Sequence, residues 1–262
     1  MPDPPRASPR TAPRVTPARV ISIAVPGTVP GTECRVVDSA QRADRDGPAY
    51  GRLHAMAGTA GYGEAAEALV AQYESVTFDE VHREVLHLFP SEPSSVLDIG
   101  AGSGRDAAAL AARGHRVVAV EPTTEMRTLG RSLHADQDIE WIDDALPGLP
   151  RLSARQPRFG LILLTAVWMH LDEQQRSAAM AHLAGLLEPG GRVILSLRHG
   201  PVPEGRRMFP VTARETVALA RRSGLHVVHH ARREDPHGRP GVAWTCLGLR
   251  LCAGGGTCPE AG

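Results

Sequence analysis

Short apolar runs alternate with helix-forming segments along the chain from about residue 64. Five runs have the length and composition of strands, at 95–99, 116–120, 139–142, 159–165 and 192–197. Segments with helical spacing are expected to form helices at 64–73, 77–88, 105–113, 123–133 and 172–187. Regular alternation of strand and helix is typical of an α/β domain built on a mostly parallel sheet.

The C-terminal part of the pattern predicts one more helix and two strands. The motif Thr212-x-x-Glu215 opens a helix that ends at Gly224. Two apolar runs follow at 225–231 and 242–251, and the polar loop between them is short enough for a hairpin. We therefore expect the last strand to run antiparallel to its neighbours.

Three alternating glycines follow the first strand, at Gly100, Gly102 and Gly104. Glycine allows a positive backbone φ and lets the main chain approach a ligand that a Cβ would obstruct. The alanine-rich helix after the turn directs its N-terminal amides and dipole at the same place. Glu121 ends the next strand, where a carboxylate can accept both hydroxyls of a ribose. This layout predicts a site for a nucleotide-type cofactor.

The spacing of the glycines indicates which cofactor. A dinucleotide site has the pattern G-x-G-x-x-G, whereas this turn reads G-x-G-x-G with Asp98 two residues before it. A carboxylate here would repel a pyrophosphate but suits an ammonium and a sulfonium. The segment 96–104 together with Glu121 resembles the class I S-adenosylmethionine (SAM) methyltransferases, and a nicotinamide enzyme fits less well.

The resemblance covers about residues 64–251 and implies a Rossmann-like α/β fold. The family has a mostly parallel seven-stranded sheet with an antiparallel last strand, and the helices at 64–90 would form an N-terminal lid. Carried over position by position, the cofactor-binding residues are Tyr73, Asp98, Gly100, Gly102, Gly104, Glu121, Pro122, Asp143, Asp144, Ala145 and Thr165.

Several of these assignments have alternatives. Asp144 is preferred over Asp143 as the acid that reads the adenine edge, although the pair also suits a solvated loop. Tyr73 would lie over the methionine end of the cofactor and favour the sulfonium through cation–π attraction, or it would be a core tyrosine. Thr165 would lie near the amino-acid end. Many relatives carry an aspartate where this chain has Gly160, so any role of that acid is absent.

A methyl transfer needs an acceptor held near the sulfonium and a base if the acceptor must lose a proton. His170 and His199 follow the fourth and fifth strands, where the strands of a parallel sheet present their carboxyl ends. Both are therefore candidate catalytic residues, together with Tyr73. A structural histidine bonded to a loop is an equal alternative for His170.

The segment 198–209 is expected to bind the acceptor because it follows the fifth strand and is rich in proline and glycine. Arg198 and Arg206 could hold a carboxylate or phosphate of a substrate, or pair with surface acids. Trp168, with Met169 and Phe209, would supply an apolar wall. Lid residues that could line the same pocket, or instead face solvent, are Glu74, His82 and His87.

Composition narrows the partners. Lys plus Arg number 29 and balance 29 Asp plus Glu, which argues against nucleic acid or an anionic membrane as the obligatory partner. The four cysteines lack paired C-x-x-C spacing, so no metal site is expected and a reduced, cytoplasmic compartment is favoured. No apolar run reaches the roughly 18 residues that a membrane span needs.

The ends of the chain differ from the rest. Residues 1–20 contain six prolines and four arginines, which cannot support a packed core. We expect a disordered Pro/Arg-rich tail at 1–47, a SAM-binding domain at 48–253 and a second disordered tail at 254–262.

Three functions stay open from the sequence. The first is a methyltransferase that moves the methyl group to a small-molecule acceptor by in-line displacement. The second is an enzyme that cyclises SAM to azetidine-2-carboxylate and releases methylthioadenosine, which would need a closed pocket. The third is a non-catalytic SAM-binding partner. The acceptor, its nucleophilic atom and the oligomeric state are not specified by this sequence.

Overall fold

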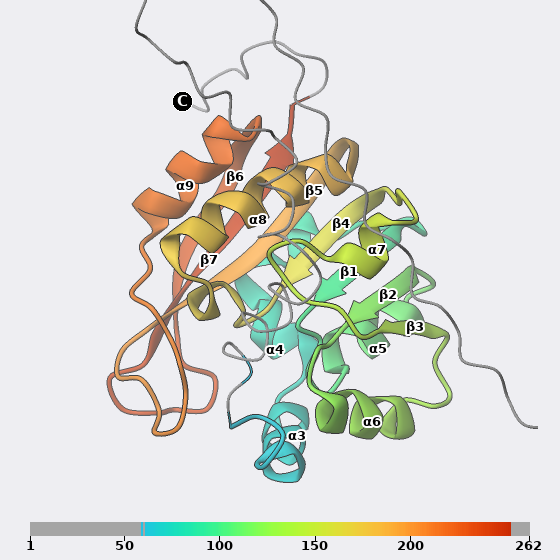
Figure 1. Ribbon diagram of the computed structural model, residues 1–262, viewed down its shortest axis with the longest axis vertical. Helices are drawn as coiled ribbons and strands as arrows, with labels where there is room; N and C mark the ends of the chain where they lie inside the picture. Colours follow the sequence, from blue (N-terminus) through green and yellow to red (C-terminus); the bar gives the residue numbers. More distant parts are fainter. Residues whose placement is uncertain (1–58, 60, 253–262) are drawn as a thin grey trace, which may run out of the picture.

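The computed structural model describes residues 59 and 61–252, which form a seven-stranded sheet with helices on both faces (Figure 1). The strand order is β3-β2-β1-β4-β5-β7-β6. The strands are β1 Ser95–Ile99, β2 Arg116–Val120, β3 Ile139–Ile142, β4 Phe159–Leu164, β5 Leu187–His199, β6 Leu225–Glu234 and β7 Ala243–Leu251.

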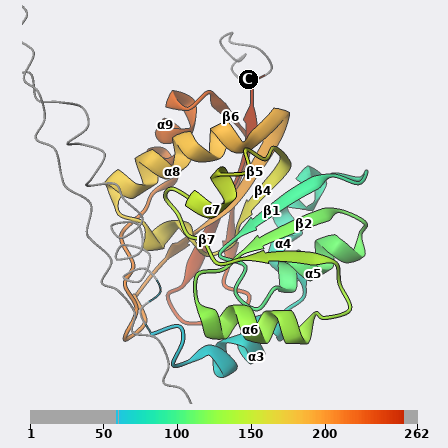
Figure 2. The same cartoon turned by 45° about the vertical axis from the view of Figure 1, so that its right-hand side comes forward.

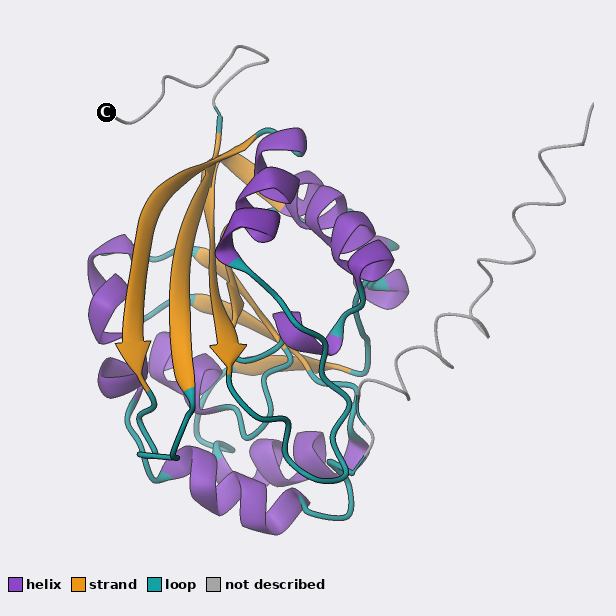
Figure 3. Cartoon of the chain, turned by 90° about the vertical axis from the view of Figure 1, so that its left-hand side faces the viewer, coloured by secondary structure: helices purple, strands orange, loops and turns teal. Residues whose placement is uncertain are grey.

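The pairing of the strands confirms the predicted topology. Strands β1 to β5 pair in parallel, and β7 runs antiparallel to both β5 and β6. The hairpin from β6 to β7 is among the long strands drawn side by side in Figure 3. Because the strands of the parallel part end at one edge, the loops that follow them meet there.

Helices cover the two faces of the sheet, and Figure 2 separates these layers. Their bounds are α3 Ala66–Glu74, α4 Phe78–His82, α5 Arg105–Ala112, α6 Thr124–Leu133, α7 Pro150–Ser153, α8 Glu173–Leu186 and α9 Ala213–Arg222. Alternate residues of each strand point to opposite faces, so Leu97 joins the apolar cluster under α8 and α9, whereas Val96 joins the cluster under α4 and α5.

The helical segment expected at 77–88 differs from the prediction in both form and place. It consists of α4 and a 3-10 helix, η1, at Arg83–Leu88. Phe78, Val85 and Leu88 are buried in the cluster on the α5 face of the sheet. This segment is therefore core packing rather than a lid, because its apolar residues need an apolar face to cover. Helix α3 lies over the cofactor edge, where it packs beside α6 (Figure 1).

Strand β5 is longer than the predicted 192–197. It begins at Leu187, directly after α8, and includes Pro189, Gly190 and Gly191. Gly160 of the adjacent β4 has a packing reason, because a Cβ at this position would collide with Ser94 Oγ. The short helices α7 and η2, Trp168–His170, were not predicted.

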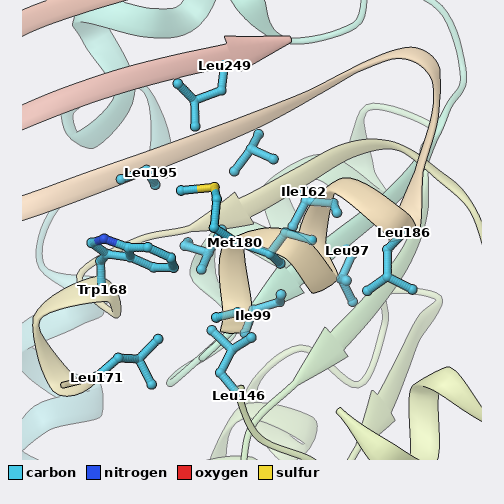
Figure 4. Packing of buried hydrophobic residues seen from close by; sticks show 14 of the residues in the cluster. Leu97, Ile99, Leu146, Ile162, Trp168, Leu171, Met180, Leu186, Leu195 and Leu249 are labelled. Carbon is cyan, nitrogen blue, oxygen red and sulfur yellow. The ribbon is translucent and has the colours of Figure 1, made fainter. Parts of the chain in front are cut away.

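Trp168 belongs to the core instead of the acceptor site. Its side chain is fully buried and packs beside Leu171 and Met180 (Figure 4). Within the described residues its indole Nε1 has no hydrogen-bond partner. This placement corrects the expectation that Trp168 walls the acceptor pocket, since the 3-10 turn of η2 directs the ring inward.

Some expectations fall on other parts of the chain. The predicted tails 1–47 and 254–262 lie outside the described residues, as do Cys34 and Cys258. Cys246 is a free, buried thiol, whereas Cys252 is disulfide-bonded. No described helix is long and apolar enough to cross a membrane. No cluster of metal-binding side chains occurs between residues 61 and 252.

Candidate functional site

The glycine turn after β1 has the backbone conformation that the sequence predicts. Gly100, Gly102 and Gly104 have φ values of 69°, 58° and 87°, which L side chains rarely adopt. The amide of Gly100 donates to the Val120 carbonyl at 2.7 Å and ties the turn to β2. A Cβ at Gly100 would lie 2.5 Å from Val167 Cγ2. Position 100 therefore requires glycine both for its backbone conformation and for lack of space for a Cβ.

A cavity of about 520 Å³ lies at this edge of the sheet. Its volume is in the range of pockets that hold small ligands, about 300–1,000 Å³. One half is walled by the glycine turn and the ends of β2 and β3, and the other half by the loops after β4 and β5 and the β6–β7 hairpin loop. The predicted residues on its wall are Tyr73, Asp98, Gly100, Gly102, Glu121, Pro122, Asp144, Ala145, Thr165, His170, Arg198 and Arg206.

Glu121 is a buried carboxylate that is hydrogen-bonded to the glycine turn. Its Oε2 accepts the amide of Gly102 at 2.9 Å and its Oε1 accepts the amide of Thr123 at 2.8 Å. Burial raises the pKa of this carboxyl, although the two amides oppose the change. The side chain is 5% exposed, so its remaining lone pairs face the cavity or the protein rather than bulk water.

The structure separates the two candidate acids after β3. Asp144 is buried, lines the cavity and accepts the amides of Ala145 at 3.0 Å and Leu152 at 2.9 Å. Asp143 lies outside the cavity wall and forms ion pairs with Arg127 and Arg151. Asp144 is therefore the acid of this pair that lines the cavity, whereas Asp143 belongs to a surface ion-pair network, and the role of Asp144 toward adenine stays a prediction.

Asp98 carries a buried oxygen with an unmet hydrogen-bonding capacity. Its side chain is almost fully buried on the cavity wall, and its Oδ2 has no hydrogen-bond partner in the described part of the chain. Burial and the nearby carboxylate of Asp106 raise the pKa of this group. A cationic ligand group beside it would relieve both effects, since it would supply hydrogen bonds and opposite charge.

A network centred on Asp106 was not predicted. His82 Nε2 contacts Asp106 Oδ2 at 2.8 Å, Arg105 Nε donates to Oδ1 at 2.8 Å, and the Thr165 hydroxyl donates to Oδ2 at 2.7 Å. Burial alone would raise the pKa of Asp106, but His82 and Arg105 outweigh it and hold the pKa far below its usual value. The network ties α4 and β4 to the start of α5, so Thr165 is fixed against the cavity wall.

Tyr62, Tyr73 and His170 form a hydrogen-bonded cluster on the acceptor side. His170 Nε2 lies 3.1 Å from the Tyr62 hydroxyl, and Nδ1 lies 2.9 Å from the Arg207 carbonyl. Because a carbonyl only accepts, Nδ1 carries the proton, and Nε2 is left to accept from Tyr62. Tyr62 also bonds to the hydroxyl of Tyr73. Burial lowers the pKa of His170, so the imidazole is neutral near pH 7.

Tyr62 was missed in the sequence because it precedes the first predicted helix. The only signal was an aromatic residue in a chain that is 4% aromatic. Its ring lies under the guanidinium of Arg206, whose Cζ is 3.7 Å from the ring centroid. The ring of Tyr73 packs against Gly102.

The β6–β7 loop also reaches the cavity and was not expected there. Its residues His237 and Arg239 line the wall beside Arg198. Arg239 is held by two bonds to Asp235, from Nε to Oδ2 at 2.9 Å and from Nη2 to Oδ1 at 2.6 Å. The polar run between the last two strands was the available signal, but chain order alone does not bring it beside β5.

Several predicted residues lie away from the cavity wall, namely Gly104, Asp143, Trp168, His199, Glu74, His82 and His87. The His199 ring contacts the Thr245 hydroxyl at 2.8 Å, because the antiparallel partner β7 lies beside it. His87 stacks on His229, and Glu74 contacts His134. Gly104 instead makes room for the ring of Trp141, 2.8 Å from where its Cβ would be.

Comparison with known proteins agrees with this geometry. Residues 96–191 match the family model of a methyltransferase domain. A demethylmenaquinone methyltransferase of Clavibacter sepedonicus is 33% identical over 126 residues. That match covers 46% of this chain and 48% of the relative, so it spans about half the length of either protein.

Two solved structures share the fold. The 1,6-didemethyltoxoflavin-N1-methyltransferase of Burkholderia thailandensis, solved with its substrate and S-adenosylhomocysteine, has a TM-score of 0.57 at 21% identity and covers 84% of this chain and 93% of its own. A TehB-like SAM-dependent methyltransferase of Corynebacterium glutamicum has a TM-score of 0.54 at 19% identity, covering 71% and 97%. At these identities the likeness establishes the fold alone.

The matched segment 96–191 is less than half of the chain, and the seven-stranded sheet shares the fold of these two methyltransferases. The matched segment and the fold therefore both resemble methyltransferases.

Proposed function

We propose that this protein is a SAM-dependent methyltransferase that acts on a small-molecule acceptor. The observation that carries the proposal is one cavity with Asp98, Glu121 and Asp144 on one half and the hydrogen-bonded pair of His170 and Tyr62 on the other half. The names of the relatives support a small acceptor, since the Burkholderia protein was solved with 1,6-didemethyltoxoflavin.

The residues of the first half fit SAM. Glu121 would accept ribose hydroxyls, Asp144 would face the adenine edge, and the Asp98 oxygen without a partner would receive the ammonium group. The Tyr73 ring lies against Gly102, where it would cover the sulfonium end. When bound, SAM supplies a methyl group on a positively charged sulfur, which an in-line nucleophile can displace.

His170 and Tyr62 are the proton-accepting pair in this proposal. The lone pair of His170 Nε2 is directed at the Tyr62 hydroxyl, and the Arg207 carbonyl holds the ring in that orientation. An acceptor hydroxyl or amine beside Tyr62 would pass its proton through the tyrosine to His170. His199 is not part of this proposal, because it lies off the cavity wall.

The cavity extends beyond the cofactor half, which favours transfer to an acceptor over cyclisation of SAM. The loops after β4 and β5 and the β6–β7 loop line this extension. A cyclising enzyme needs only the amino nitrogen of its own substrate and was expected to have a closed pocket. A non-catalytic partner would have no use for the oriented imidazole.

The test is incubation of the full chain with SAM labelled in the methyl group and a metabolite extract, followed by mass spectrometry. We expect labelled products heavier by one methyl group, with a rate about 10²–10⁴-fold lower in His170→Asn. The control variant His226→Asn changes a histidine that lies outside the cavity wall. Methylthioadenosine without a methylated product would instead mean cyclisation, and binding without turnover would mean a non-catalytic partner.

A pH profile separates a base from a structural histidine. Burial lowers the pKa of His170 below its ordinary value of 6.5, so the base stays neutral as the pH falls through 6.5. The wild-type rate should therefore fall only at a pH below 6.5. The variant Tyr62→Phe should lower the maximal rate by a larger factor than it changes the KM. A Tyr62→Phe variant with the wild-type maximal rate would contradict the proton path.

A further inference from the structure

Charge is distributed unequally within the cavity. Carboxylates from the ends of β1, β2 and β3 line the cofactor half, as Asp98, Glu121 and Asp144. Arginines line the opposite half, as Arg198 and Arg206 in the segment after β5 and as Arg233 and Arg239 in the hairpin. The two halves therefore attract opposite charges, and only the first is accounted for by a cationic cofactor.

The acids near this second half do not neutralise it. Asp235 is engaged by both bonds from Arg239 and also accepts the Trp244 indole Nε1 at 2.9 Å. Glu204 is on the wall but is exposed to solvent. Asp235 is thus already engaged by Arg239 and Trp244, and within the described part of the chain it forms no hydrogen bond with Arg198.

Arg198 has unused hydrogen-bonding capacity, as does Arg233, whose Nε is also buried without a partner in the described part of the chain. The Nη1 of Arg198 donates to the Pro201 carbonyl at 2.8 Å, which fixes the guanidinium at the cavity wall. Its Nε is buried and has no partner among residues 61–252. Burial and the nearby Arg239 lower the pKa of Arg198, as expected for a cation that lacks a counterion.

We infer that the acceptor carries an oxyanion, a carboxylate or a phosphate, which Arg198 binds next to Arg239. A planar oxyanion accepts two parallel N–H bonds from a guanidinium, which gives both affinity and orientation. Met169, Met208 and Trp244 line the same half, so the body of the acceptor is apolar. This inference rests on the proposed function, because the bound anion is the methyl acceptor only if the protein is a methyltransferase. The anion site itself depends only on the residues of the cavity.

Ligand-observed NMR and calorimetry on the full chain test the anion site, with S-adenosylhomocysteine present and absent. The probes are benzoate, phenyl phosphate and the neutral isostere benzamide. We expect the wild type to bind an anionic probe about tenfold or more tightly than benzamide, since a hydrogen bond to a charged group adds about that factor. Whichever anion binds more tightly identifies carboxylate or phosphate as the group.

The variant Arg198→Gln should abolish the preference for the anion, and Arg198→Lys should keep part of it. The matched control Arg221→Gln changes an exposed arginine of α9 that is absent from the cavity wall. Unchanged circular dichroism shows that each variant is folded. Equal binding of all three probes by the wild type, or an anion preference that survives in Arg198→Gln, would overturn the inference.

The result is distinguishable from a failure of the proposed function. Anion binding that depends on Arg198 in a protein that never methylates would leave the site intact and reject the enzyme. Methylation of neutral compounds by a protein that shows no preference for anions would support the enzyme and reject the anion site.

Discussion

Replacement of Glu121 tests the cofactor site and the turn together. Its two carboxylate oxygens accept the Gly102 and Thr123 amides at 2.9 and 2.8 Å. Glu121→Gln keeps one acceptor and turns an amide NH₂ toward the other buried donor, which costs about 1–3 kcal/mol. Glu121→Ala leaves both donors without a partner, so the cost is about 2–6 kcal/mol. The raised pKa of Glu121 places the observed loss in the lower half of each range, because removing the buried charge recovers part of its desolvation.

The effect on SAM binding should exceed the effect on stability in the conservative variant. Loss of one charge-assisted hydrogen bond to a ribose hydroxyl, about 1.5–3 kcal/mol, predicts a Kd for SAM that is roughly 10–150-fold higher in Glu121→Gln. The assays are urea unfolding followed by tryptophan fluorescence, and isothermal titration with SAM.

A matched control is Glu140→Gln on the neighbouring strand. Glu140 is exposed and pairs with Arg155 at the surface, so its replacement should change the free energy of unfolding by less than about 1 kcal/mol and leave the Kd unchanged. A Glu121→Gln variant that binds SAM as tightly as the wild type would refute the assignment of this carboxylate to the ribose. Wild-type stability in Glu121→Ala would refute its structural role.

Three further predictions follow from the packing and the buried charges. Gly100→Ala should lower the free energy of unfolding by about 1–3 kcal/mol, because Ala disfavours the positive φ and its Cβ would collide with Val167. A second substitution, Val167→Ala, should remove the collision and restore only that part of the stability. Urea midpoints measure both changes, and full restoration in the double variant would show that the positive φ costs nothing. Trp168→Ala should cost about 3–5 kcal/mol in thermal or urea unfolding while KM for the acceptor stays unchanged, whereas a raised KM with normal stability would return Trp168 to the acceptor site. The pKa of Asp106 is lower in the folded protein than its ordinary 3.8, so the unfolded chain takes up the proton first as the pH falls. The free energy of unfolding should therefore fall as the pH drops below about 4, and it should fall less steeply in Asp106→Asn. Equal slopes of the free energy of unfolding against pH in the two proteins would contradict the role of the His82 contact.

The local parts of the site could be predicted from the sequence because their residues are neighbours in it. The glycine turn, the strand before it and Glu121 after the next strand lie within one βαβ unit, so their spacing carries the geometry. The start of the helix predicted from residue 172 is likewise local, because Asp172 and Gln175 form a capping box with both reciprocal hydrogen bonds.

The acceptor half could not be predicted in the same way, because its residues come from distant parts of the chain. Tyr62 and His170 are 108 positions apart, and the β6–β7 loop reaches the cavity only through the antiparallel pairing of β5 with β7. The same pairing carries His199 to Thr245 and away from the cavity.

Hydrophobic period and glycine spacing thus determined by themselves the class of fold and the glycine turn at the edge of the sheet, since strand alternation and local backbone sterics specify them. Only tertiary structure decided which aromatic, histidine and arginine side chains share the second half of the cavity. Side chains such as Trp168 and His82 carry both an apolar ring and a polar nitrogen. The packing around each decides whether the ring fills the core, as in Trp168, or the nitrogen also contacts a carboxylate, as in His82.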